Sequence, residues 1–413
     1  QQLLEQLLTR DQMKRVRVAS CDQIAREIVA ARRKLGRIES DSDARQRLAS
    51  IRRTYEPKAE SAFEAKVRAR AMARLSDSYL LEEFDWVISG RGLSSIGEYL
   101  EAARPGRGVA FPDRLRIAVW GLYEAFRDSR RDERFSDLRN EALDMVRQPG
   151  WTGHWDFVFV DEAQDLSPSA LALMAEVCRS PQGLFFAADS KQSLYSRNYT
   201  WSSAHPRLQF KGRTANLTRN YRSTREIDAA AFGLVQREEG VAAEPSTSVH
   251  DGPLPVLLRG VVPEEQAKWI ARFIRQMAAH LHLQQNAAAV LVPTSDIGES
   301  IAMQLDAEGI PAQFFPGREL DLKAACVKLL TMHSAKGLEF PIVVVAGFEE
   351  GTYPTSEDFE DPGLYEERMR QERRLLYVAL TRAMRGLMLV VPKGCRHQAL
   401  MELDSTHWHM ENV

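Results

Sequence analysis

The sequence has few cysteines and no long apolar run. Only four of its 413 residues are cysteines, and no two of them form a CxxC pair. This spacing predicts neither a disulfide framework nor a zinc site. No apolar stretch approaches the length that crosses a bilayer, and the first residues lack the charged start, apolar middle and cleavage site of a secretory signal. We therefore expect a cytoplasmic protein with reduced thiols and no membrane contact.

A strong charge of either sign is also missing. The 55 basic and 57 acidic residues leave a formal net charge of −2 at pH 7. This balance argues against a protein coated in basic charge, although it allows a local basic groove. With 44% hydrophobic residues, the chain is long enough for two or three domains with separate cores. Any function on nucleic acid must therefore be argued from motifs.

The residue pattern changes near residue 150. Before it, apolar side chains recur at helical spacing and predict a mostly helical region. Examples are Ile24, Ile28 and Val29, and later Phe63, Val67 and Met72. From residue 156 on, short apolar runs alternate with helical stretches, which predicts α/β domains with parallel sheets. The predicted strands are 157–160, 184–188, 256–258, 288–292, 327–330, 342–346 and 387–391. The stretch 264–280 predicts a helix with one face packed on a sheet.

The basic residues of the helical region gather between residues 32 and 53. They are Arg32, Arg33, Lys34, Arg37, Arg45, Arg47, Arg52 and Arg53. Such a cluster can follow a phosphate backbone. Because acids such as Glu39 and Asp41 are interleaved with it, a solvated helix face is the other interpretation.

The most informative stretch is an apolar strand that ends in acids, VFVDEAQD at residues 158–165. The carboxyl end of a parallel strand is where α/β sheets bind ligands. Asp161 could there hold a hydrated Mg²⁺ beside nucleotide phosphates, and Glu162 could orient the attacking water. A bare Asp-Glu pair after a strand is more often a solvated turn, so the interpretation depends on the rest of the string and on further motifs.

The whole string resembles the Walker B motif of UvrD/Rep-type superfamily 1 DNA helicases. Four further stretches follow in the motif order of that family. They are FAADSKQSLY at 186–195, LTRNYRS at 217–223, TMHSAKGLEF at 331–340 and ERRLLYVALTRA at 372–383. One such match could be a solvated helix start or a core stripe, but five in order favour the family. The resemblance covers residues 155–390 and is loose before them.

This resemblance implies a role for each matching residue. The implied catalytic residues are Asp161, Glu162, Gln192, Arg222 and Arg382, with Asp161 as the metal ligand and Arg382 as an arginine finger. The implied nucleotide contacts are Gln192, Arg222, Glu339 and Arg382. The implied DNA contacts are Tyr195, Arg197, His333 and Ser334, with Tyr195 stacked on a base.

The resemblance also implies an architecture and an activity. The expected fold class is α/β, with two RecA-like domains at 1–215 and 216–413 and a helical insertion at about 35–145 of the first. ATP with Mg²⁺ would be hydrolysed between the domains and would drive movement along single-stranded DNA with 3′-to-5′ polarity. The implied partners are single-stranded or partly duplex DNA and a protein of a repair, recombination or defence complex.

One part of the family pattern is missing, the phosphate-binding loop GxxGxGK[ST]. No Gly-Lys dipeptide occurs in the 413 residues. Because this loop normally precedes the other motifs, we expect a chain truncated at its N-terminus; a loop that never existed, or one supplied by a partner chain, are the alternatives. The chain alone should then bind ATP poorly and be inactive. A catalytically silent DNA-binding or partner-docking module, or the motor subunit of a nuclease or defence complex, remain alternative functions.

Overall fold

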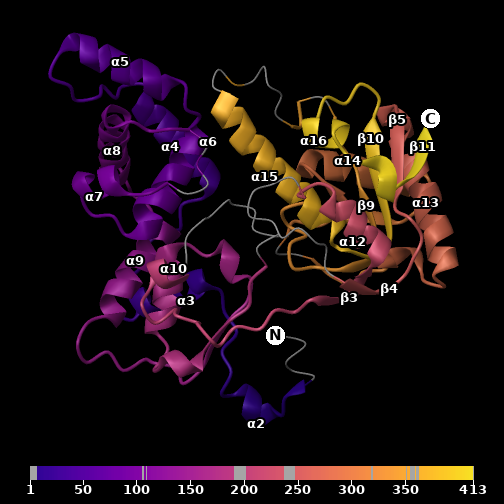
Figure 1. The fold of residues 1–413 in the computed structure, drawn as a ribbon, viewed down its shortest axis with the longest axis horizontal. Helices are drawn as coiled ribbons and strands as arrows, with labels where there is room; N and C mark the ends of the chain where they lie inside the picture. The colour runs from indigo at the N-terminus through magenta and orange to yellow at the C-terminus, as the bar shows by residue number, and fades with distance from the viewer. Residues whose placement is uncertain are drawn as a thin grey trace. The chain divides into compact units, whose positions relative to one another are not determined.

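The computed structural model of the protein describes residues 7–104, 107, 109–189, 201–236, 247–317, 320–349, 351–353, 359 and 362–412. The chain divides into two compact units (Figure 1). The first contains described residues 7–189 and 201–212, and the second contains described residues 213–412. Both units combine helices with parallel strands, which confirms the predicted α/β fold class. Within the described residues, no helix is both long enough and apolar enough to cross a bilayer.

Most of the first unit is helical, as predicted. A π-helix over Glu83–Ile88 and a 3₁₀ turn over Ser89–Arg91 follow α6 without a break. Serine hydroxyls at five helix N-termini each accept a hydrogen bond from a backbone N–H three residues on, which explains where these helices begin. The helices before the first strand are α2 (Arg10–Met13), α3 (Cys21–Ala30), α4 (Asp41–Arg52), α5 (Ala62–Ala73), α6 (Asp77–Glu82), α7 (Ile96–Glu101), α8 (Asp113–Asp128) and α9 (Phe135–Val146).

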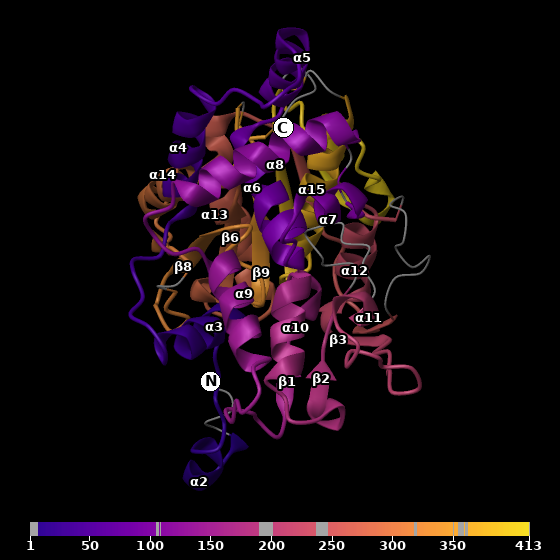
Figure 2. The same ribbon diagram turned by 90° about the vertical axis from the view of Figure 1, so that its left-hand side faces the viewer.

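The sheet of the first unit has two parallel strands, β1 (Val158–Val160) and β2 (Leu184–Phe186). The chain between them forms α10 (Pro168–Glu176), and the short α11 (Trp201–Ala204) lies later in the chain. Val158, Val160 and Leu184 are buried in a core to which α3, α9 and α10 contribute. Figure 2 shows α10 beside the two strands. One face of this small sheet is therefore covered by helices.

The second unit is built on a seven-stranded parallel sheet in the order β11-β5-β10-β9-β6-β8-β7. A separate parallel pair joins β3 (Arg219–Thr224) to β4 (Thr247–His250). The strands of the large sheet are β5 (Val256–Val261), β6 (Ala288–Val292), β7 (Ala312–Phe314), β8 (Val327–Thr331), β9 (Phe340–Val345), β10 (Ala383–Pro392) and β11 (His409–Asn412).

Helices cover both faces of the seven-stranded sheet. Ala289 and Leu291 of β6 join the core beneath α12 and α15, whereas Val290 and Val292 join the core beneath α13 and α14. This alternation explains why the central strands read as continuous apolar runs. The helices are α12 (Arg225–Phe232), α13 (Gln266–His280), α14 (Ser295–Ala307), α15 (Pro362–Leu380) and α16 (Gln398–Met401). The predicted helix at 264–280 is confirmed as α13, with a 3₁₀ turn before it.

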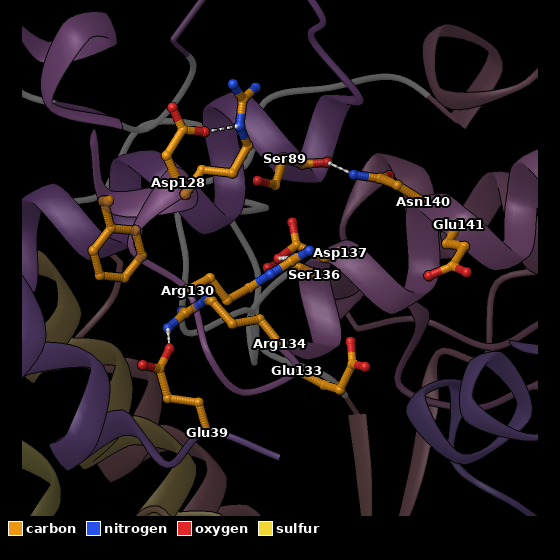
Figure 3. Close-up of polar contacts among 12 residues, drawn as sticks. Glu39, Ser89, Asp128, Arg130, Glu133, Arg134, Ser136, Asp137, Asn140 and Glu141 are labelled. Atoms are coloured by element: carbon orange, nitrogen blue, oxygen red, sulfur yellow. Dashed lines mark hydrogen bonds and ion pairs between the residues drawn. The ribbon is translucent and has the colours of Figure 1, made fainter. Parts of the chain in front are cut away.

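Within the described part of the chain, four of the eight residues in the basic cluster at 32–53 form ion pairs, namely Arg33, Arg37, Arg47 and Arg52. Arg33 binds Glu133 and Glu141, each with an N–O distance of 2.6 Å. Arg47 binds Glu39 at 2.6 Å and lies over the ring of Phe126. Figure 3 shows the acidic partners Glu39, Glu133 and Glu141. A second arginine, Arg134, also binds Glu39 at 2.8 Å. The cluster therefore holds the helices together.

Candidate functional site

The acidic turn lies at the carboxyl end of β1. Glu162 has a left-handed backbone with φ of 51°, which a non-glycine residue adopts only when its surroundings hold it there. Two main-chain hydrogen bonds join this turn to the residue after β2. Ala163 N–H donates to the carbonyl of Ala187 at 2.9 Å, and Ala187 N–H donates to the carbonyl of Val160 at 2.8 Å. The turn is thus fixed to both strands.

The side chains of this turn are arranged around Gln164. Its amide nitrogen donates to the carboxylate of Glu162, and its amide oxygen accepts from the backbone N–H of Asp189 at 3.0 Å. The Asp161 carboxylate accepts from the backbone N–H of Glu162 at 3.0 Å. Gln164 is buried, so it orients Glu162 from inside the unit. Sequence reasoning assigned no role to Gln164, although it lies in the string that carried the resemblance.

Asp161 is exposed, and within the described part of the chain neither it nor Glu162 forms an ion pair. The described residues contain no group of three or more His, Cys, Asp or Glu side chains that could hold a metal ion. A single exposed carboxylate fits Mg²⁺, which keeps several waters and binds proteins through one or two carboxylates plus substrate phosphates. Asp161 would hold that ion, and Glu162 would hold a water.

The outer face of the β1–β2 sheet carries three aromatic side chains. Phe157, Phe159 and Phe185 are 65%, 75% and 48% exposed, and the rings of Phe159 and Phe185 stack with centroids 4.7 Å apart. Parallel sheets are usually covered on both faces. This sheet is covered on one face alone within the described residues, because Val158 and Val160 point into the core and Phe159 points out.

Three predicted site residues, Gln192, Tyr195 and Arg197, lie outside the described residues. Their proposed contacts with nucleotide and DNA stay predictions.

In the second unit, Arg222 and Glu339 form an ion pair with an N–O distance of 2.5 Å. Arg222 lies on β3 and Glu339 directly precedes β9, so residues more than a hundred positions apart meet here. The main chain of Arg222 is held twice: its N–H donates to the Asn220 side-chain oxygen at 2.8 Å, and its carbonyl accepts from Arg385 at 2.8 Å. Arg385, on β10, carries no motif signal, and sequence reasoning missed it.

Arg382 is buried, with 1% of its surface exposed. Its guanidinium donates to the carbonyl of Val378 at 2.9 Å, to the carbonyl of Leu338 at 3.3 Å and to the hydroxyl of Thr381 at 3.3 Å. These contacts tie it to the residue next to Glu339. The arginine-finger role implied for Arg382 stays a prediction, and it requires the guanidinium to leave these oxygens.

His333 and Ser334 lie in the turn after β8. Ser334 N–H donates to the hydroxyl of Thr331 at 3.2 Å, and the two hydroxyls are 2.8 Å apart. Desolvation lowers the pKa of His333, with a smaller opposing effect from Glu372. More than a third of the His333 surface is exposed, which limits this effect. A lowered pKa favours the neutral ring, which has one nitrogen that donates a hydrogen bond and one that accepts.

Comparison with protein families gives two matches. Residues 7–210 match the UvrD/REP helicase N-terminal domain, and residues 316–394 match the UvrD-like helicase C-terminal domain. The acidic turn falls in the first match, and Glu339 and Arg382 fall in the second. Arg222 lies in neither.

Several curated proteins are similar to parts of the chain. A probable DNA helicase of Mycoplasma pneumoniae is 26% identical over 62% of this chain and 48% of the relative. DNA helicase IV of Escherichia coli is 25% identical over 60% of this chain and 36% of the relative. DNA helicase II of Haemophilus influenzae is 51% identical over 19% of this chain and 10% of the relative. The chain thus spans about half the length of these relatives or less.

Among solved structures, the C-terminal domain of a possible DNA helicase from Lactobacillus plantarum matches with a TM-score of 0.35. It is 21% identical, and the match covers 46% of this chain and 98% of that one.

Proposed function

The chain belongs to the UvrD/Rep-like superfamily 1 DNA helicases, and from this premise we propose that it is the motor part of an ATP-dependent translocase on single-stranded DNA. The observation that carries the proposal is the acidic turn after β1. A strained, non-glycine backbone at Glu162 is maintained by contacts from β2, and Gln164 orients its carboxylate. Strain of this kind is concentrated at functional sites.

The two units supply different parts of the proposed chemistry. Phosphoryl transfer needs groups that position water and metal, and cations that stabilise the charge on the phosphate oxygens. Asp161 and Glu162 of the first unit have the first role, and Arg222 and Arg382 of the second have the other. Mg²⁺ would neutralise phosphate charge beside Asp161. We propose that residues 1–215 and 216–413 act as two RecA-like domains and that hydrolysis between them drives 3′-to-5′ movement.

The Arg222–Glu339 ion pair supports a nucleotide site in the second unit. Arg222 is assigned to a phosphate and Glu339 to the sugar of the nucleotide. When no nucleotide is bound, each neutralises the other, which lowers the cost of leaving a half-buried charge without a partner. In the proposed complex, Arg222 would exchange Glu339 for a phosphate of the nucleotide, and Glu339 would exchange Arg222 for its sugar.

The test is ATP hydrolysis with and without single-stranded DNA, measured on the 413-residue chain and on the full-length product of its gene. Glu162→Gln in the full-length product should reduce hydrolysis by a factor of at least 100, because the water loses the group that orients it. Asp156→Asn is the matched control: this exposed carboxylate precedes the same strand at its opposite end and, among the described residues, forms its ion pair with Arg179 at 3.2 Å. The control should hydrolyse ATP normally.

A catalytically silent DNA-binding or partner-docking module is the second candidate function. It predicts a full-length product that binds DNA and hydrolyses no ATP, with Glu162→Gln binding DNA as well as the unchanged protein. Hydrolysis that persists unchanged in Glu162→Gln would contradict both the silent module and the role proposed for the acidic turn.

A further inference from the structure

Helix α5 in the first unit exposes a face that combines aromatic, aliphatic and basic side chains. Phe63 is 78% exposed and Val67 is 47% exposed. Lys66 and Arg70 are also exposed. At 3.6 residues per turn, these four side chains lie within roughly 100° of one another around the helix. Because Phe63 and Val67 are one turn apart on the helix, they form an exposed apolar patch, a feature that can mark a binding surface.

The opposite face of α5 is anchored, so the helix cannot roll to bury Phe63. Arg68 and Met72 are buried there, and α5 packs against α8. Arg68 donates to the carbonyl of Lys58 at 2.5 Å and binds Glu64 at 2.6 Å. The side that carries Phe63 therefore faces away from the core of its unit.

The exposed face is cationic. Glu64 is the only acid in α5, and its carboxylate is occupied by Arg68 and by the backbone N–H of Glu60, which donates at 3.1 Å. Within the described residues, neither Lys66 nor Arg70 forms an ion pair or a side-chain hydrogen bond. This contrasts with Arg33, Arg37, Arg47 and Arg52 of the basic cluster at residues 32–53, which are bound to acids.

We propose that this face of α5 binds a single strand of nucleic acid, with Phe63 stacked on a base and with Lys66 and Arg70 on phosphates. Two cations four residues apart on a helix are separated by about 6 Å along its axis, a spacing that suits neighbouring phosphates of an extended strand. Stacking tolerates any base, and cationic side chains beside an aromatic ring are the usual composition of a single-strand site. This contact is separate from the predicted DNA contacts at Tyr195, Arg197, His333 and Ser334.

A single strand fits this face better than a duplex or an acidic protein. Phe63 and Val67 lie on a convex helix surface, where a duplex would present sugar and phosphate but no open base. An acidic protein would satisfy Lys66 and Arg70 without needing the exposed ring at that position. The proposal does not depend on ATP hydrolysis. The α5 contact can therefore be refuted while the motor function stands, and the motor function can be refuted while the α5 contact stands.

The test is equilibrium binding of a fluorescein-labelled oligo(dT) to the 413-residue chain, followed by anisotropy at several salt concentrations. Lys66→Ala with Arg70→Ala should weaken binding and reduce the slope of log K against log salt by about 1.4, since each single-strand phosphate contact contributes about 0.7. Phe63→Ser should weaken binding by roughly 5- to 150-fold, which corresponds to about 1–3 kcal/mol of stacking, with little change in slope.

The matched control replaces two exposed arginines of the same unit, Arg26 and Arg131, by alanine. It removes the same charge and should change the slope much less. The proposal is overturned if the wild-type chain does not bind, or if the α5 double variant behaves like this control. It is also overturned if poly-L-glutamate displaces the oligonucleotide and Phe63→Ser has no effect, because the face would then be a general polyanion surface. Circular dichroism of each variant checks its helix content.

Discussion

Replacing Glu83 should strongly destabilise the helical part of the first unit. Glu83 begins the π-helix after α6, and its side chain is fully buried. Its carboxylate accepts from Tyr99 at 2.8 Å, from Arg104 at 2.6 and 2.8 Å, and from Arg107 at 3.2 Å. The two arginine side chains are only 5% and 8% exposed. Glu83→Ala would therefore leave the buried Arg104 without a carboxylate and Arg107 with Glu82 as its remaining acidic partner.

The magnitude follows from this burial. Removing one partner of a buried ion pair costs about 3–5 kcal/mol, because the remaining charge is desolvated and unpaired. Glu83→Gln keeps the shape and one acceptor oxygen, so it should cost about 1.5–3 kcal/mol, the value of hydrogen bonds to a charged group. Glu82→Ala is the matched control: Glu82 also binds Arg107, at 2.7 Å, but its side chain is 28% exposed. Its loss should cost about 1 kcal/mol or less.

The assay is urea denaturation of the three variants, together with hydrogen exchange measured on peptides from α6 and α8. The expected order of destabilisation is Glu83→Ala, then Glu83→Gln, then Glu82→Ala. If Glu83→Ala loses no more stability than Glu82→Ala, the buried cluster does not hold this region and the argument is refuted.

The same cluster gives a pH dependence. Burial raises the pKa of Glu83, but Arg104 and Arg107 outweigh it and bring the pKa below its ordinary value. A carboxyl with a depressed folded pKa contributes its stability fully above the unfolded pKa of about 4.3 and loses it as the pH falls through the folded value. The gap between the wild-type chain and Glu83→Ala should therefore be complete at pH 7 and shrink below about pH 4.

Three further changes test other contacts. Arg385→Ala should lower ATP hydrolysis by the full-length product by up to about 100-fold, because Arg385 holds the main chain of Arg222; Arg385→Lys should recover part of it, and an unchanged rate would show that Arg222 needs no such support. Gly183→Ala would place a methyl group 2.1 Å from a neighbouring main-chain oxygen and should cost about 1–3 kcal/mol of unfolding free energy in urea, whereas Gly36→Ala, with 3.7 Å to its nearest neighbour, should cost little. Folding lowers the pKa of His333, so the unfolded chain takes up the proton first and stability should fall as the pH drops through about 6.5; a His333→Gln variant with the same pH profile would contradict this.

The seven strands predicted from apolar runs are all present, because buried parallel strands carry a continuous apolar signal. The strands that sequence reasoning missed are β3, β4, β7 and β11. They lie at sheet edges or in a small separate pair, where one side chain in two is exposed and the apolar run is lost. Helical spacing correctly predicted α5, but it could not tell that Phe63 and Val67 face water while Met72 is buried.

The part of the site that lies within one short stretch of sequence was predictable. The string at 158–165 forms a fixed acidic turn at a strand end, as its sequence pattern implied. The contacts that hold the main chain of Arg222 were not predictable. The Asn220 side chain accepts from its N–H, and Arg385, which lies far away in the sequence on β10, donates to its carbonyl. Likewise, no local pattern indicates that Arg382 is buried against backbone carbonyls. Contacts of this kind depend on tertiary packing.

The uncovered aromatic face of β1 and β2 also bears on how the chain behaves in a test tube. Phe159 and Phe185 form a stacked, water-exposed pair beside Phe157. Two chains that meet through this face would bury the rings against each other, so association should rise with protein concentration. Ammonium sulfate would promote this association, because sulfate strengthens the burial of apolar surface, and cooling would weaken it, because apolar burial stabilises less at low temperature. Purification is therefore best done cold, dilute and at low sulfate.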